Sequence, residues 1–205
     1  MVKTGDWIKG GWALVQPDMW MHVVIALLIS VISGTGLGGF IVPTLMCGWI
    51  YIFLQKMRNP SYTVQIGDVF SKGFEVFVPS LVAGILLSIA LSIGFSLCIL
   101  PGFVVLGLTL LALPLIIDRR MDFWPAIQLS LDTTKGQWMN WSIFALALAG
   151  VNLVGAIVCG VGVLVTWPIT VAATAIAYSE TFGASAPVAP TAPPVVPPSI
   201  APPAA

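Results

Sequence analysis

Charged residues are scarce in this sequence. Asp, Glu, Lys and Arg make up 8% of the 205 residues, whereas soluble domains carry about 25%. Hydrophobic residues make up 58%, and the mean hydropathy is +1.02. A folded surface with so few polar groups cannot face water, so the expected solvent is lipid. This composition excludes a soluble enzyme, a disordered chain and a disulfide scaffold.

Residues that carry chemistry are equally few. The chain has one histidine and three cysteines, and it has no Cys-x-x-Cys pair, Ser/His/Asp set or phosphate-binding glycine loop. The net charge is zero and the pI is near 6.5, which argues against nucleic acid because that partner requires a basic surface. We therefore expect no catalytic residue, cofactor or metal site, and the lipid bilayer as the partner.

The few charges leave three long uncharged stretches. They contain 37, 42 and 44 residues and lie between Asp18 and Lys56, Glu75 and Asp118, and Lys135 and Glu180. A membrane-crossing helix needs about 20 apolar residues, so each stretch can cross twice. Glycine or proline interrupts each stretch near its middle, as a tight turn between helices requires. The pattern predicts three helical hairpins.

The predicted fold is an all-α membrane protein with six transmembrane helices arranged as three hairpins, each preceded by a short amphipathic interfacial helix. A membrane β-barrel is excluded because the apolar runs do not alternate with polar residues. Residues 1–183 form the predicted transmembrane domain. The predicted crossings are 18–34, 40–56, 76–95, 101–117, 138–158 and 162–180.

The basic residues predict the orientation. All eight Lys and Arg lie at the open ends of the hairpins, and none lies at the glycine-rich turns. Basic residues favour the cytoplasmic side, so both termini are expected there. Six of the eight tryptophans lie near the same boundary, where amphipathic rings are enriched.

The segments before the hairpins resemble one another. Residues 5–17 align with residues 67–79 through matching glycine, aspartate, aromatic and proline positions at an offset of 62. Convergence is the alternative, because any interfacial helix before a hairpin needs a cap and aromatic residues. If the units are homologous, they are parallel repeats about an axis along the membrane normal. The expected repeats are 5–66, 67–121 and 122–183.

Each predicted interfacial helix has an aspartate near its start. Asp6, Asp68 and Asp122 are expected N-caps, because a carboxylate accepts hydrogen bonds from the free amides of a first helical turn. The apolar face of each helix is expected to rest in the headgroup zone. In the first helix this face comprises Trp7, Ile8, Trp12 and Val15.

The last 22 residues, 184–205, contain eight of the sixteen prolines and no charge. Such a segment cannot continue a helix and samples extended polyproline II conformations. We expect a disordered Pro/Ala-rich tail; the alternative is a tether for a partner.

Asn152 and three prolines are the candidate functional residues within the crossings. Asn152 lies between small residues and is expected to hydrogen-bond to a neighbouring helix; the alternative is a substrate contact. Pro43, Pro114 and Pro168 lie in the returning helices and are expected to be tolerated kinks. The alternative is that they face a transport cavity.

Three further polar features have simpler interpretations. His22 is expected to be an interfacial or packing residue, because no second metal ligand lies at helical spacing from it. Cys98 and Cys159 are close to outer turns, so they are expected either as free thiols or as a disulfide. Asp118, Arg119, Arg120 and Asp122 are expected to form a salt-bridged loop facing the headgroups; the alternative is an enzyme site.

Several short motifs resemble a widespread family of uncharacterised bacterial polytopic membrane proteins. The resemblance covers residues 4–183 and implies a six-helix domain in the bacterial inner membrane. It carries no activity or catalytic residue to this chain. The motifs are Ile99-Leu100-Pro101-Gly102-Phe103, Leu113-Pro114-Leu115-Ile116-Ile117-Asp118-Arg119, Asp122-Phe123-Trp124-Pro125-Ala126 with Ser130, and Asn152, Gly155, Cys159-Gly160-Val161-Gly162 and Pro168.

The absence of charge within the crossings favours a non-enzymatic membrane component that acts through packing or lipid contact. A small transporter or channel is the second hypothesis, because three return helices contain proline. A membrane enzyme with a site on the cytoplasmic loops is the third.

Overall fold

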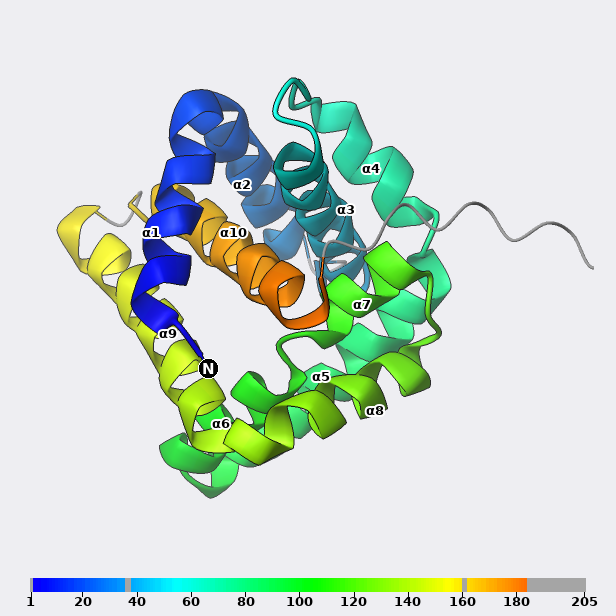
Figure 1. Cartoon of the computed structure of the whole chain (residues 1–205), viewed down its shortest axis with the longest axis vertical. Helices are drawn as coiled ribbons and strands as arrows, with labels where there is room; N and C mark the ends of the chain where they lie inside the picture. Colours follow the sequence, from blue (N-terminus) through cyan, green and yellow to red (C-terminus); the bar gives the residue numbers. More distant parts are fainter. Residues whose placement is uncertain (1, 36–37, 160–161, 184–205) are drawn as a thin grey trace, which may run out of the picture.

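The computed structural model describes residues 2–35, 38–159 and 162–183. All regular elements of these residues are helices (Figure 1). The predicted tail, 184–205, lies outside the described residues. The helices are α1 (Thr4–Val15), η1 (Gln16–Asp18), α2 (Met19–Gly34), α3 (Gly38–Arg58), α4 (Ile66–Phe74), α5 (Phe77–Leu97), α6 (Ile99–Thr109), α7 (Ala112–Arg119), α8 (Phe123–Thr134), η2 (Lys135–Gln137), α9 (Trp138–Cys159) and α10 (Val163–Phe182).

Six helical stretches among the described residues are long and apolar enough to cross a membrane. This number agrees with the six predicted crossings, and the described fold is all-helical. Two of the stretches also include the preceding amphipathic helix. In these two, a short 3-10 helix, η1 or η2, joins that helix directly to the next one. The stretches are Thr4–Gly34, Phe40–Arg58, Phe77–Leu97, Ile99–Arg119, Phe123–Ile157 and Val163–Phe182.

The helices fall into three consecutive units with the same order. Each unit has a leading helix (α1, α4 or α8), an ascending helix (α2, α5 or α9) and a return helix (α3, α6–α7 or α10). Pro17 lies at the start of η1, where its fixed φ suits a first turn. Gly136 occupies the corresponding short segment η2. These breaks separate the leading helix from the crossing that follows it.

The second return helix is interrupted within the predicted crossing 101–117, which falls inside the apolar stretch Ile99–Arg119. Leu110 and Leu111, between α6 and α7, are turn residues that keep right-handed dihedrals, with φ of −57° and −87°. Pro114 lies in the first turn of α7 and has no N–H to donate to the carbonyl one turn earlier. Near the break, the Leu108 carbonyl accepts hydrogen bonds from Ser130 Oγ at 2.7 Å and Thr134 Oγ1 at 3.0 Å. Hydroxyl groups from α8 thus donate hydrogen bonds to a backbone carbonyl, which lipid could not do.

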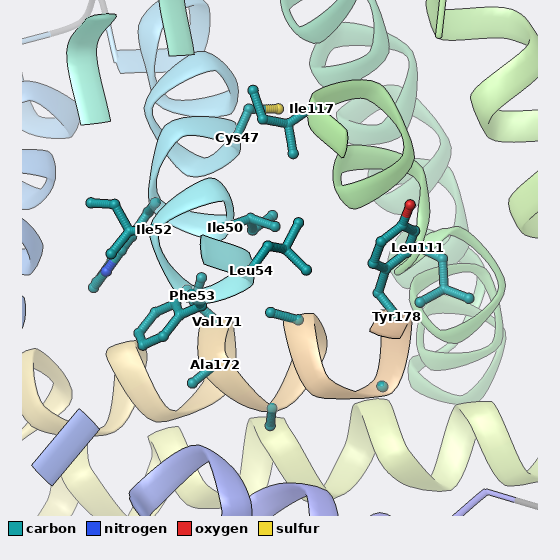
Figure 2. Close-up of a cluster of buried hydrophobic side chains, with 14 of the residues drawn as sticks. Cys47, Ile50, Ile52, Phe53, Leu54, Leu111, Ile117, Val171, Ala172 and Tyr178 are labelled. Atoms are coloured by element: carbon teal, nitrogen blue, oxygen red, sulfur yellow. The ribbon is translucent and has the colours of Figure 1, made fainter. Parts of the chain in front are cut away.

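The ascending helices connect the units. Each packs against the return helix of its own unit and against the return helix of the preceding unit. The order is cyclic, so the unit that precedes the first is the third. The pairs are α2 with α3 and α10, α5 with α6 and α3, and α9 with α10 and α6. The return helices form the centre, where Ile50 and Leu54 of α3 point towards Leu111 and Tyr178 (Figure 2).

The leading helices follow the same cyclic rule. Helix α1 packs on α10, α4 on α3, and α8 on α7 (Figure 1). The prediction that the whole apolar face of α1 rests among headgroups is therefore wrong. Trp7 and Val15 are buried against protein, at 3% and 0% exposure, whereas Trp12 is 42% exposed.

Close approach explains why these helices pack on protein. A small residue on each leading helix lies against a backbone carbonyl of the return helix. A Cβ at Gly11 or Gly73 would come within 2.8 or 2.5 Å of that carbonyl oxygen, so a larger residue would push the helices apart. In the third unit, a serine hydroxyl donates to the carbonyl. The three contacts join Gly11 to Ile169, Gly73 to Thr44, and Ser130 to Leu108.

The predicted N-caps do not form. Helices α1 and α4 begin before their aspartates, so Asp6 and Asp68 lie inside the first turn. Asp122 does occupy the N-cap position of α8, but its side chain makes no capping hydrogen bond. All three carboxylates still lie where the positive end of the helix dipole favours a negative charge.

Candidate functional site

Asp118 lies in a buried polar cluster at the ends of three return helices. Its side chain is 3% exposed, and Oδ1 accepts from Arg58 Nη2 at 2.5 Å. Oδ2 accepts from the Tyr178 hydroxyl at 2.8 Å. The carboxylate of α7 therefore joins the end of α3 to the end of α10. Both of its oxygens are occupied by protein groups, which suits a structural link.

The neighbouring candidates point to different places. Arg119 donates to the Phe182 carbonyl at 3.5 Å and lies over the Phe182 ring at 4.9 Å. Arg120 has a left-handed backbone, with φ of 52°, which ends α7. Its guanidinium pairs with Glu75. Asp122 is the N-cap residue before α8 and makes no capping bond. The structure thus separates the four residues of the predicted cluster instead of joining them around one pocket.

Two titratable groups in the connections between crossings, Glu75 and Tyr62, have shifted pKa values. The Lys72 ammonium and the Arg120 guanidinium, both hydrogen-bonded to Glu75, lower the pKa of that carboxyl. Burial and a hydrogen bond to Asp68 raise the pKa of the Tyr62 phenol. Both groups are therefore held in their ordinary neutral-pH forms, the carboxylate charged and the phenol neutral.

Asn152 bonds across the interface of α9 and α10, as the first of its two interpretations predicts. Its Nδ2 donates to Thr170 Oγ1 at 2.7 Å and to the Leu148 carbonyl at 2.9 Å. Its Oδ1 accepts from Thr166 Oγ1 at 3.1 Å. Gly155 lies against the Thr166 side chain and leaves no room for a Cβ. The hydrogen bonds of the Asn152 amide are therefore made to two closely packed helices.

The three candidate prolines pack against protein in different ways. Pro43 lies within α3, and its ring contacts Gly84 of α5 so closely that a Cβ there would meet it at 2.2 Å. Pro168 is buried within α10. Pro114 is buried after the break between α6 and α7. These contacts fit the interpretation of tolerated kinks.

His22 has an aromatic environment that the sequence did not indicate. It is fully buried, and its Nδ1 accepts from Trp49 Nε1 at 3.2 Å. Its ring stacks on Phe53 with centroids 4.6 Å apart. Within the described residues, no group of three His, Cys, Asp or Glu could hold a metal. Cys98 is exposed, and its proposed pairing with Cys159 involves a side chain outside the described residues.

A polar cavity of about 440 Å³ lies at the end of the bundle that carries the charges. It lies between the start of α1, the end of α8, the start of α9 and the end of α10. Trp7 and Trp141 line it with ring centroids 5.6 Å apart, and Lys3 pairs with Glu180 at 3.3 Å. None of the sequence candidates lines it. The lining residues are Val2, Lys3, Trp7, Thr133, Gln137, Trp141, Glu180 and Thr181.

The sequence could not reveal this cavity, because its lining comes from three stretches of the chain, residues 2–7, 133–141 and 180–181, that are distant in sequence. The only local sign is the position of Trp7 and Trp141 near the predicted inner boundary. No family model, curated protein or solved structure matches this chain. The resemblance to a bacterial membrane family therefore stays a prediction.

Proposed function

We propose that the chain is a non-enzymatic integral component of the bacterial plasma membrane that acts through helix packing and lipid contact. The main support is the bonding of Asn152, the most polar residue in the middle of a crossing. Its donors and its acceptor are used by α9 and α10. A polar group that served a substrate would leave part of its hydrogen-bonding capacity free.

The outward side chains of the crossings support the same function. Large apolar residues of α2, α5 and α9 are exposed, at fractions that water would not favour. An apolar groove of about 590 Å³ also runs between α6 and α9, where acyl chains would find a matching surface. Examples that are at least half exposed are Val31, Ile89, Ile93, Leu97, Leu153, Val154 and Ile157.

Flux through reconstituted vesicles tests this proposal against transport. Proteoliposomes loaded with a small fluorescent dye or a pH indicator are expected to leak no faster than protein-free vesicles of the same lipid. The transport hypothesis expects instead a flux that scales with protein and changes in Asn152→Leu. Such a flux would overturn the proposal that the chain acts through packing and lipid contact.

We also propose that both termini face the cytoplasm. Ion pairs at the helix ends support one charged face: Lys3 with Glu180 joins the two ends of the described chain, and Arg58 with Asp118 joins α3 to α7. Single cysteines in a cysteine-free background test the orientation. Thr35→Cys and Leu97→Cys should react with an impermeant maleimide on intact spheroplasts, and Ser61→Cys should react only after lysis. Equal labelling of all three would contradict the orientation.

The three units are proposed to be internal repeats. The support is the cyclic packing of equivalent helices and the repeated contact between a small residue and a carbonyl. Convergence on a common cap and aromatic pattern explains similar leading segments, but it does not require each of them to pack on the preceding unit.

A further inference from the structure

The repeated carbonyl contact gives a register for comparing the units. The contacted residues are Thr44, Leu108 and Ile169, one in each return helix. Twelve positions after each of them, near the charged end of the bundle, stand Lys56, Arg120 and Thr181. Two of these are basic, and the third is short and neutral.

In the first two units, the basic residue at the end of the return helix forms an ion pair with the leading segment of the same unit. Lys56 pairs with Asp18 and donates to the Leu14 carbonyl at 3.1 Å, so it reaches back to the end of its own leading segment. Arg120 similarly pairs with Glu75, directly after α4. A long cationic side chain thus fills the space beside the leading segment in both units.

In the third unit, this ion pair is missing. Thr181 is too short to reach back, and Gln137 stands seven positions after Ser130, as Asp18 stands seven positions after Gly11. Thr181 and Gln137 are both neutral, so the ion pair of the first unit has no counterpart in the third, whereas in the second unit the acidic partner is Glu75, two positions after Gly73. The 440 Å³ cavity opens at this place, and both Thr181 and Gln137 line it.

The lining has balanced charge and one aromatic wall. Lys3 and Glu180 contribute one positive and one negative group, with side chains 55% and 42% exposed. Trp7 and Trp141 form the aromatic wall but are only 3% and 4% exposed, so the polar contacts come from Thr133, Gln137 and Thr181, which offer hydroxyl and amide groups. An exposed ion pair is weakly held, so a ligand can replace it.

We propose that this cavity binds the headgroup of a zwitterionic phospholipid of the phosphatidylethanolamine type. Lys3 and the neutral donors would hold the phosphate, while Glu180 would hold the ammonium. An anionic headgroup fits less well because it would leave Glu180 facing a like charge. This proposal rests on the proposed lipid-contact function and names the lipid class.

The bilayer is the proposed source because acyl-chain surface adjoins the cavity. Gln137 and Trp141 face the cavity, while Trp138, Met139 and Ser142 on the adjoining side of α9 line the apolar groove with α6. A lipid can therefore present its headgroup to the cavity while its chains remain on the apolar surface. A volume of about 440 Å³ lies within the range of small-molecule sites, about 300–1,000 Å³.

Lipid binding to the full chain in detergent micelles tests the proposal. Short-chain phosphatidylethanolamine and phosphatidylglycerol are titrated separately, and native mass spectrometry measures the bound fraction. We expect at least tenfold tighter binding of phosphatidylethanolamine. We also expect soluble phosphoethanolamine to bind at least tenfold more weakly than the lipid. Equal binding of both lipids would overturn the headgroup assignment, and equal binding of the soluble compound would overturn the bilayer as source.

A double variant tests the location of the site. Thr181→Lys with Gln137→Asp recreates in the third unit the ion pair that closes the first, so it should fill the cavity and abolish the preference for phosphatidylethanolamine. Glu180→Gln should weaken the preference for phosphatidylethanolamine at least tenfold. Lys135→Gln, which removes a charge from an exposed pair beside η2, is the control and should bind as the unaltered chain does.

The unfolding midpoint of the double variant shows whether it folds. If the midpoint is unaltered and the variant still prefers phosphatidylethanolamine, the cavity is not the site. The vesicle flux assay is independent of this result. A flux would reject the function in packing and lipid contact, whereas a chain without flux and without headgroup preference would reject only the headgroup site.

Discussion

Two ion pairs at the charged end of the bundle differ in burial. Arg58 and Asp118 join the ends of two return helices, with side chains 15% and 3% exposed, and Tyr178 occupies the second carboxylate oxygen. Lys3 and Glu180 face a cavity, with side chains about half exposed. The first pair is enclosed by the central helices, and the second lies where the third unit lacks its closing cation.

The comparison shows how burial decides what an ion pair can do. Removing one partner of a buried pair leaves an uncompensated charge that costs about 3–5 kcal/mol. An exposed pair contributes about 0–1 kcal/mol, because water solvates its members when they separate. A pair of the first kind holds helices together, whereas a pair of the second kind can exchange its partner for a ligand.

The largest expected effect comes from breaking the buried pair. Asp118→Asn leaves the Arg58 guanidinium without its counter-charge, and we expect unfolding in mixed micelles to become easier by about 3–5 kcal/mol. The midpoint of an SDS titration measures it. The control is the double variant Asp118→Asn with Arg58→Met, which removes both charges and should recover most of the loss. A single variant as stable as the unaltered chain would contradict the structural role of Asp118.

A smaller effect is expected at the interface of α9 and α10. Asn152→Leu removes bonds to Thr166 and Thr170, and such bonds between membrane helices are worth about 0.6 kcal/mol on average and up to about 1.7. The same SDS titration measures the change. Thr174→Val is the matched control, because its hydroxyl bonds only to the Thr170 carbonyl of its own helix. Equal losses in both variants would argue against the interhelical role.

The exposed pair should affect stability little. Glu180→Gln is expected to lower the free energy of unfolding by less than about 1 kcal/mol, because Lys3 remains accessible to water. This variant is also expected to lose headgroup preference, so binding and stability should separate. A loss as large as that of Asp118→Asn would show that the pair holds the fold and is not free to exchange.

The smallest effect is a pH dependence at Glu75. Its pKa is lowered in the folded chain by Lys72 and Arg120, so its contribution to stability is present above its unfolded pKa of about 4.3 and is lost as pH falls through the lower folded value. The stability difference between the unaltered chain and Glu75→Gln should therefore shrink under acid. Asp132→Asn, in an exposed pair within one helical segment, is the control. A difference that grows under acid would contradict this sign.

The sequence predicted the crossings well because the cost of placing charge in lipid acts on every residue of a span. Asn152 was also predicted from its surroundings, since an amide between small residues needs a close helix as partner. These signals are local and can be read from one segment. The break between α6 and α7 was not predicted, although Pro114 marked its position, because proline alone does not distinguish a kink from an interruption.

The packing of the leading helices and the cavity could not be predicted in the same way. Amphipathic periodicity shows that α1 has an apolar face, but it does not show whether lipid or α10 covers that face. Asp118 lies in a charged run that reads as an exposed loop, yet Arg58 and Tyr178 bury it from distant positions. Which segments meet depends on the three-dimensional arrangement of the units.

The docking of α1 on α10 has a consequence for biosynthesis. The helix that leaves the ribosome early in synthesis packs against the one that leaves it last among the described helices. Domains generally fold as the chain emerges, yet Gly11 has no carbonyl to meet until Ile169 has been synthesised. Until then, the leading segment lacks its packing partner, and a polypeptide released before α10 would leave the cycle of units open.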